Sequence, residues 1–137
     1  MKPLRRSCAR CGRQLSVPRH RNRKKYCHRC EQIVLRERKQ AAHDKRVETL
    51  YGLNPGEYRK LYEAQGGRCA IHGCRARGLV LALAVDHDHK KGFTREAVRG
   101  LLCKRHNREI GYNHDDPEVF DSIAAYLRNP PAKKVLT

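Results

Sequence analysis

The sequence predicts a small α+β protein made of two separately stabilised parts. Three observations support this fold class. The chain has 137 residues with only 6% aromatic residues, its seven cysteines fall into close groups, and short apolar runs alternate with polar, helix-favouring segments. A chain this short and this poor in aromatic side chains buries too little apolar surface to be held by its core alone. We therefore expect bound metal ions to supply part of the stability.

The charge of the chain is strongly positive, with a formal net charge of +17 at pH 7. Residues 1–50 contain 16 Lys and Arg against 4 Asp and Glu, whereas residues 51–137 contain 15 against 10. Such a chain attracts polyanions, and release of counterions would make its binding to nucleic acid salt-dependent. No apolar run approaches the ~18 residues that span a bilayer, and the first residues lack the apolar stretch of a signal peptide. We expect a cytoplasmic protein without a membrane partner.

Two Cys-x2-Cys pairs near the N-terminus predict a four-cysteine zinc ribbon over residues 1–32. Fifteen residues separate the pairs. In a reducing compartment, close cysteine pairs indicate metal thiolates in preference to disulfides. The binding energy of zinc can order a segment that has almost no core of its own. The predicted ligands of this first zinc ion are Cys8, Cys11, Cys27 and Cys30.

A basic loop lies between the two cysteine pairs, and a basic helix is expected after them. The five Lys and Arg side chains of residues 19–25 either contact DNA phosphates or form a solvated charge run, and both interpretations stay open. Residues 33–50 favour a helix without an apolar stripe, which would connect the ribbon to a second domain over residues 51–137. The candidate DNA-contacting residues are Arg19, Arg21, Arg23, Lys24 and Lys25.

The second domain is expected to begin with a short helix. Asn54 can cap this helix, and Glu57 stands where a capping box requires an acidic residue. The helix is predicted over residues 55–65 because two glycines follow it. Its apolar side chains at helical spacing are predicted to belong to the core. They are Tyr58, Leu61 and Tyr62.

The rest of this domain is predicted to run strand, loop, strand, helix, helix. The apolar run 78–85 predicts a buried strand, residues 97–102 predict a second strand, and a short helix follows as far as Gly111. A second cap-and-proline signal at Asp116 starts a final helix. Because apolar residues recur along residues 119–127 at helical spacing, this last helix is expected to pack on its own domain or on a partner subunit.

Three further cysteines and a histidine predict a second zinc site that ties the two ends of the strand pair together. Cys69 and Cys74 precede the first strand, and Cys103 and His106 follow the second. His72 is a rival of Cys74, since Cys69-x2-His72 also has the spacing of zinc ligands. We favour Cys74 because a free thiol would otherwise remain. A closed site of this kind is structural.

The segment Asp-His-Asp-His over residues 86–89 predicts a reactive site together with Asn107. Phosphodiester hydrolysis needs a base with a pKa near neutrality and a hard cation. His87 and His89 can supply the base, and Asp86 with Asn107 can supply oxygen ligands for Mg²⁺ or Mn²⁺. Side chains alternate along a strand, so the strand must end or bend near Asp86 if its neighbour is to face the same phosphate. The alternatives are a hydrogen-bonded corner and a third zinc site on the two histidines.

Several segments of the chain together resemble the recombination endonuclease VII family of phage-type His-Me finger (HNH) nucleases. The resemblance covers roughly residues 51–127, leaves out the N-terminal ribbon, and implies a ββα-metal nuclease domain with a C-terminal helix. The loop 90–96 is longer than in the family, and the role of Glu109 is left open. The segments that carry the resemblance are Gln65–Cys69, Val85–His89, Val98–Cys103, His106–Asn107 and Gly111.

The resemblance implies a role for each candidate residue. Asp86 and Asn107 would bind the catalytic cation, His87 would be the general base, and His89 would assist at the phosphate, leaving a 5′-phosphate and a 3′-hydroxyl. Relatives of this kind cut branched DNA such as four-way (Holliday) junctions, and some act as dimers. Branched DNA and a homodimer are therefore implied.

The expected function is that of a metal-dependent DNA endonuclease that nicks or resolves branched DNA, with two structural zinc ions and one catalytic divalent cation. The alternative from another class is a zinc-dependent DNA-binding accessory protein without catalysis. Such a protein has no need for an oxygen ligand such as Asn107 beside His87. The charge alone is equally compatible with RNA as substrate.

Overall fold

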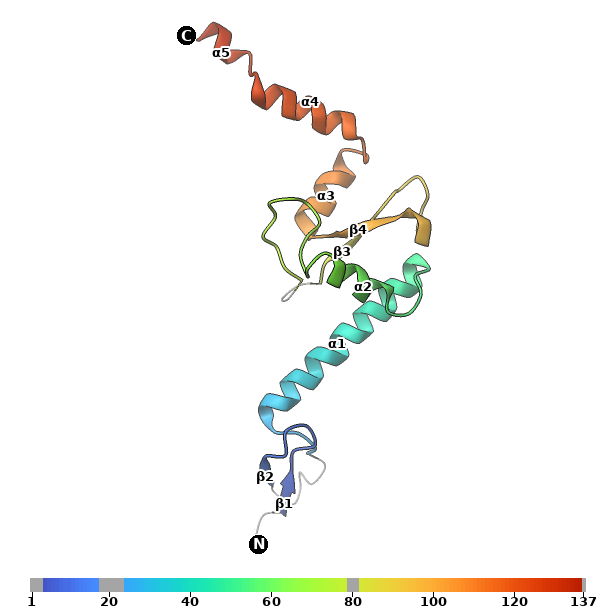
Figure 1. The fold of residues 1–137 in the computed structure, drawn as a ribbon, viewed down its shortest axis with the longest axis vertical. Coiled ribbons are helices and arrows are strands. Elements are labelled where there is room, and N and C mark those ends of the chain that lie inside the picture. The colour runs from blue at the N-terminus through green and yellow to red at the C-terminus, as the bar shows by residue number, and fades with distance from the viewer. Residues whose placement is uncertain (1–3, 18–23, 79–81, 137) are drawn as a thin grey trace. The chain divides into compact units, whose positions relative to one another are not determined.

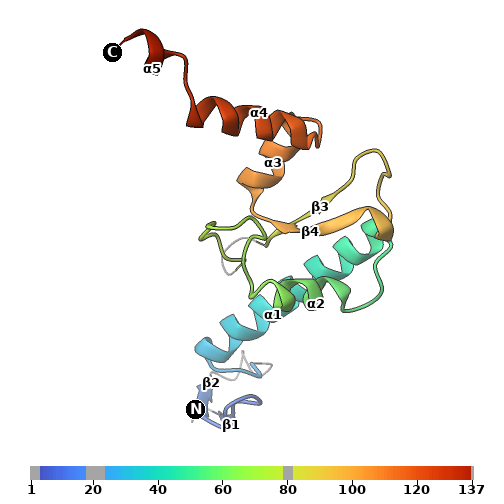
Figure 2. The same cartoon turned by 45° about the horizontal axis from the view of Figure 1, so that its top comes forward.

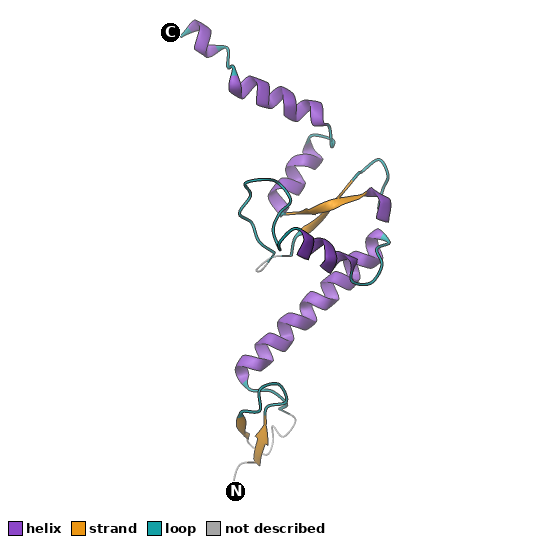
Figure 3. Ribbon diagram, viewed as in Figure 1, coloured by secondary structure: helices purple, strands orange, loops and turns teal. Residues whose placement is uncertain are grey.

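The computed structural model describes residues 4–17, 24–78 and 82–136 and confirms the small α+β class (Figures 1 and 3). The chain forms two compact units, residues 1–43 and residues 44–137, and the boundary falls inside helix α1 (His28–Tyr51). Three of the candidate DNA contacts, Arg19, Arg21 and Arg23, lie outside the described residues. None of the helices in the described ranges is both long enough and apolar enough to cross a membrane.

The first unit is a two-stranded ribbon followed by the start of α1. Strands β1 (Leu4–Ser7) and β2 (Gln14–Val17) pair antiparallel. In the turn between them, the Gly12 N–H donates to the Cys8 carbonyl at 2.9 Å with a positive φ of 70°, which glycine adopts without a steric penalty. Its interior consists of Cys8, Leu15, Cys27 and Cys30, with Tyr26 packed against them.

The second unit is built on one antiparallel strand pair, β3 (Ala84–His87) and β4 (Val98–Leu102). The strand expected over residues 78–85 is correct only at its end, because β3 begins at Ala84 and continues through His87. Residues 79–81 lie outside the described residues. A single 3₁₀ turn, Arg95–Ala97, leads directly into β4.

Four further helices of the described chain belong to this unit. They are α2 (Glu57–Ala64), α3 (Lys104–Tyr112), α4 (Pro117–Arg128) and α5 (Ala132–Val135). Helices α2 and α3 contact the strands, and α4 and α5 extend away from them (Figure 2). The expected cap operates in α4, where the Asp116 carboxylate accepts from the Glu118 N–H at 2.9 Å, an amide that the first helical turn leaves without an intrahelical acceptor. The expected Asn54 cap is wrong, because α2 begins at Glu57 with Gly56 as its N-cap and without a side-chain cap. The Glu57 carboxylate instead accepts from the Asn54 N–H at 2.8 Å, ahead of the helix.

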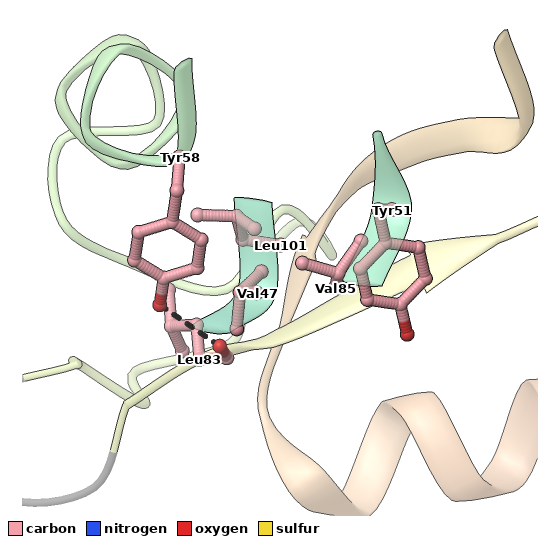
Figure 4. Packing of buried hydrophobic residues seen from close by; sticks show 6 residues of the cluster. All are labelled: Val47, Tyr51, Tyr58, Leu83, Val85 and Leu101. Carbon is pink, nitrogen blue, oxygen red and sulfur yellow. Dashed lines mark hydrogen bonds between the residues drawn. The ribbon is translucent and has the colours of Figure 1, made fainter. Parts of the chain in front are cut away.

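A hydrocarbon core holds α1, α2 and the strand pair together (Figure 4). The side chains of Leu61 and Tyr62 pack against this core, as the pattern along α2 predicts. Tyr58 is completely buried, and its hydroxyl donates to the Leu83 carbonyl at 2.9 Å. The buried members of the core are Val47, Tyr51, Tyr58, Leu83, Val85 and Leu101.

The Gln65 side chain fastens the end of α2 to β4. Its carbonyl oxygen accepts from the Leu101 N–H at 2.8 Å, and its amide donates to the Leu101 carbonyl at 2.8 Å. The side-chain amide therefore takes the place of a neighbouring strand and satisfies two backbone groups of a fully buried residue. In this way the core sets the position of the strand pair that carries the candidate reactive residues.

Candidate functional site

The four cysteines of the first unit converge as a metal site requires. The four Sγ atoms of Cys8, Cys11, Cys27 and Cys30 all lie within 4.8 Å of one another. Cys11 and Cys27 have their Sγ atoms 3.8 Å apart. Thiolates bound to zinc at about 2.3 Å in a tetrahedron would stand about 3.8 Å apart. The residues present therefore fit a zinc ion.

Local backbone geometry favours deprotonation of the Cys8 thiol. The Cys27 N–H donates to the Cys8 Sγ at 3.3 Å, and this hydrogen bond is the main reason that the pKa of the Cys8 thiol is lowered to about 6. Thiolate is the form that binds metal. Because α1 begins at His28, Cys30 lies in the first helical turn. The turn between β1 and β2 thus supplies Cys8 and Cys11, and the start of α1 supplies Cys27 and Cys30.

The second cluster unites residues that are distant in the sequence. Ligand atoms of Cys69, Cys74, Cys103 and His106 lie within 4.8 Å of one another. The His106 Nδ1 atom lies 3.4 Å from the Cys69 Sγ and 3.5 Å from the Cys103 Sγ, close to the roughly 3.5 Å expected for a tetrahedral zinc with these ligands. His72 is exposed and stands outside the cluster, so the grouping favours Cys74.

Glu109 lies beside this second cluster. One of its carboxylate oxygens accepts from Arg105 at 2.9 Å, and the other lies 3.9 Å from the His106 Nε2 atom. Histidines that bind metal commonly present their second ring nitrogen to a carboxylate, which orients the ring. The position of Glu109 therefore suits the orientation of His106, a role that its place in the sequence left open.

The strand pair is irregular between Asp86 and His87. Asp86 is opposite Gly100 but His87 is opposite Val98, so the register passes over Arg99. Both residues are buried: Asp86 is 7% exposed and His87 is 8% exposed. A bulge re-aims side chains that strict alternation would send to opposite faces. The register shift is the irregularity near Asp86 that we expected from the alternation of side chains along a strand.

The His87 ring sits in an aromatic environment. Its centroid lies 5.1 Å from that of Tyr51, 5.0 Å from that of Phe93 and 4.6 Å from that of His89. Burial, followed by repulsion from the neighbouring His89, lowers the pKa of His87 below its usual value. The ring is therefore neutral near pH 7, which is the state that can accept a proton.

Arg99 links two carboxylates next to this histidine pair. Its guanidinium donates two hydrogen bonds to Asp86, at 2.7 and 2.9 Å, and also lies 3.2 Å from the Asp115 carboxylate. The bond to Asp86 is the main reason that the pKa of Arg99 is raised. Asp86, Arg99 and Asp115 form part of the wall of a cavity of about 580 Å³.

Asp115 is a site residue that sequence reasoning missed. Its carboxylate accepts from the His89 backbone N–H at 3.2 Å and lies 2.7 Å from the His89 Nδ1 atom. Burial opposes its ionisation, but the hydrogen bonds from His89 and Arg99 outweigh that effect and lower its pKa to about 2. His114 and Asp115 both have positive φ, 55° and 60°, a conformation that side chains disfavour. Neither these contacts nor the positive φ values leave a pattern in the sequence from which the role of Asp115 could be predicted.

Asn107 presents an unsatisfied oxygen. It lies on α3, which packs against both strands, and its Oδ1 atom is buried without a hydrogen-bond partner. A buried acceptor without a partner costs free energy, about 1–3 kcal/mol, unless a ligand uses it. The oxygen is of the type that hard cations bind.

Among the basic candidates of the first unit, Lys24 is half-buried and Lys25 is exposed.

Comparisons with known proteins place the second unit in a family. The chain is 46% identical over 93 residues to the "Gene 59 protein" of Mycobacterium phage L5 and to that of Mycobacterium phage D29. The match covers 66% of this chain and 53% of each relative, so the chain spans about half the length of the curated relatives it matches. No solved structure gives a significant match. A family model described as recombination endonuclease VII matches residues 44–129, and the chain belongs to that family.

Proposed function

We propose that the protein is a metal-dependent DNA endonuclease of the His-Me finger type. The observation that carries the proposal is a buried imidazole with a lowered pKa, His87, directly after a buried carboxylate, Asp86, at an irregularity of the strand pair. The order of two strands followed by a helix is that of a ββα-metal domain. Membership of an endonuclease family and the net charge of +17 agree with DNA as the partner.

In the proposed mechanism, His87 accepts a proton from the attacking water. A general base works best when its pKa lies near the working pH, and the aromatic surroundings of His87 keep it unprotonated there. His89 carries its Nδ1 atom against Asp115, so the Asp115 carboxylate orients the imidazole for a contact with the phosphate. Asp115 is a positioning residue in this scheme.

The candidate ligands of the catalytic cation are Asp86 and Asn107. The buried, unpartnered Oδ1 atom of Asn107 and the carboxylate of Asp86 fit Mg²⁺ or Mn²⁺ in ligand type. A cation bound there would stabilise negative charge on the phosphate and on the leaving oxygen. Arg99 neutralises the Asp86 carboxylate and keeps its orientation. The two cysteine-rich clusters are proposed to hold structural zinc ions.

Branched DNA and a homodimer belong to the same proposal. Helix α4 carries large apolar side chains that the described chain leaves partly open: Phe120, Ile123, Tyr126 and Leu127 are 36% to 68% exposed. A second copy of the chain could cover this face, and two active sites would then act on two strands of a branch. If the face is an interface, Ile123→Asp should yield a monomer by light scattering without loss of zinc.

The deciding experiment is cleavage of supercoiled plasmid and of a synthetic four-way junction with Mg²⁺. Wild type is compared with His87→Ala, and His72→Ala serves as a matched control because this histidine is exposed and stands outside both clusters. We expect His87→Ala to lose roughly 10²- to 10⁴-fold in rate at unchanged zinc content and DNA affinity. Equal rates for both variants would refute the assignment of the base. Binding of DNA without cleavage by wild type would instead indicate a DNA-binding accessory protein.

A further inference from the structure

The loop between β3 and β4 carries a large aromatic ring on the surface. Phe93 is 60% exposed and belongs to neither buried cluster of the described chain. A single exposed apolar side chain is common in proteins, so the significance of Phe93 depends on what its ring contacts. The ring also lies directly against the candidate general base, His87.

One side of the Phe93 ring is held in place while the remainder is open. The ring is stacked on His87 at a centroid distance of 5.0 Å and an interplanar angle of 28°, and it lies 5.5 Å from the Tyr51 ring. The loop is closed at its ends by the Asp88 N–H, which donates to the Ala97 carbonyl at 2.9 Å. A ring that is already fixed loses little conformational entropy when a ligand stacks on it.

The surroundings of the ring are suited to a polyanion. Lys90 and Lys91 precede Phe93 and are exposed, and the Arg95 side chain that follows is 52% exposed and ion-paired with Glu57 at 2.7 Å. Flat aromatic rings flanked by cationic side chains are the usual means by which proteins bind unpaired nucleotides, because the bases stack and the phosphates meet positive charge. Both elements are present here within one short loop next to His87.

We propose that Phe93 is a stacking platform for an unpaired nucleobase adjacent to the phosphate that is cut. The inference rests on the proposed nuclease function and adds a substrate preference to it. In a continuous duplex both faces of each base are covered by its neighbours, whereas at a branch, gap or flap a base is free to stack on the protein. Phe93 therefore selects DNA that exposes a base at the cleavage position.

The test places the fluorescent base 2-aminopurine at the branch point of a synthetic four-way junction, so that the design of the probe does not depend on cleavage. Binding is then followed without Mg²⁺, so that the catalytic step plays no part in the readout. The variants are Phe93→Leu, which keeps an apolar side chain without a flat face, and Phe93→Tyr, which keeps the ring. Zinc content and melting temperature are recorded for each variant.

We expect wild type and Phe93→Tyr to quench 2-aminopurine fluorescence on binding, and Phe93→Leu to lose the quenching and about tenfold in affinity for the branched probe. Affinity for the uninterrupted duplex should be the same for all three. Wild-type quenching and affinity in Phe93→Leu would overturn the platform while leaving the nuclease assignment intact. Loss of quenching in Phe93→Leu together with no cleavage by wild type would support base stacking and overturn the nuclease function.

Discussion

The two units of the chain contain similar metal-binding chemistry but differ in what surrounds it. In residues 1–43 the buried cluster consists of three of the cysteine ligands themselves and a single leucine. In residues 44–137 six apolar side chains form a core that includes no candidate metal ligand among its buried members. We therefore propose that the first unit depends on a bound metal ion for its interior, whereas the second unit has an apolar interior of its own.

A second difference concerns charge. The ion pair between Arg10 and Glu37 in the first unit is exposed, with side chains 41% and 55% accessible. In the second unit, Asp86 and Asp115 are both largely buried and share the Arg99 guanidinium. Exposed pairs are screened by water, while buried charges require partners. The buried charges, which are costly to desolvate, therefore lie at the proposed active site.

The largest expected effect is the loss of one cysteine from the first unit. Cys8→Ser should unfold residues 4–17, because structural zinc sites of this type contribute on the order of 10 kcal/mol to an otherwise coreless segment. Hydrogen exchange with mass spectrometry and zinc analysis would measure it. The matched variant Cys69→Ser removes a ligand from the other cluster and should leave the strand pair protected. Equal loss of protection in both variants would show that the two units do not differ.

Asp115→Asn should lower the rate of cleavage roughly 10- to 100-fold with little change in KM, because a misplaced imidazole costs catalysis and not binding. The neighbouring variant Asp116→Asn is the control, since asparagine caps a helix as well as aspartate does. Steady-state kinetics on the junction would decide. A rate like that of wild type in Asp115→Asn would remove Asp115 from the site.

The pH dependence of the rate should follow the lowered pKa of His87. The neutral imidazole is the active form, so the rate falls about tenfold per pH unit below that pKa and is constant above it. Because burial depresses the pKa, the midpoint should lie below the ordinary histidine value of about 6.5. Single-turnover rates between pH 5 and 8, at constant ionic strength, would test this. A midpoint above 7 would contradict the assignment of His87 as the buried base.

Tyr58→Phe probes the core of the second unit. The change leaves the Leu83 carbonyl without its donor and should reduce the free energy of unfolding by about 1–2 kcal/mol. Thermal unfolding of the zinc-loaded protein would measure it. The exposed ring of Tyr126 provides the control, since Tyr126→Phe should change the melting temperature little. Equal shifts for the two variants would contradict the proposed importance of the buried hydroxyl.

The smallest effect is expected for Arg10→Ala. Its two hydrogen bonds to Glu37, at 2.7 and 2.8 Å, are exposed to solvent, and water and salt screen such pairs so that they contribute little to stability. Zinc affinity of the first unit, measured by competition with a chelator, should stay nearly unchanged. A large loss of affinity would mean that this unit relies on more than its thiolates.

The sequence by itself determined the features that depend on short spacing along the chain. The Cys-x2-Cys pairs, the capping residue of α4, and the run of acidic and imidazole residues over 86–89 could be recognised because each motif is completed within a few residues. The prediction that the strand bends near Asp86 followed from alternation alone, and the register shift confirms that bend. The start of β3 was misplaced because an apolar run does not reveal which residues find a pairing partner.

Only the tertiary structure decided the contacts that join distant segments. Asp115 meets His89 across 26 positions, Arg99 meets Asp86 through a bulge, and Phe93 stacks on His87 by way of a folded loop. The grouping of Cys74 instead of His72 with the other candidate zinc ligands also depends on how the chain returns from Cys103. Spacing along the chain carries local geometry, whereas these pairs form only after the core has brought the strands and α3 together, and no local pattern records which distant residues the core will bring into contact.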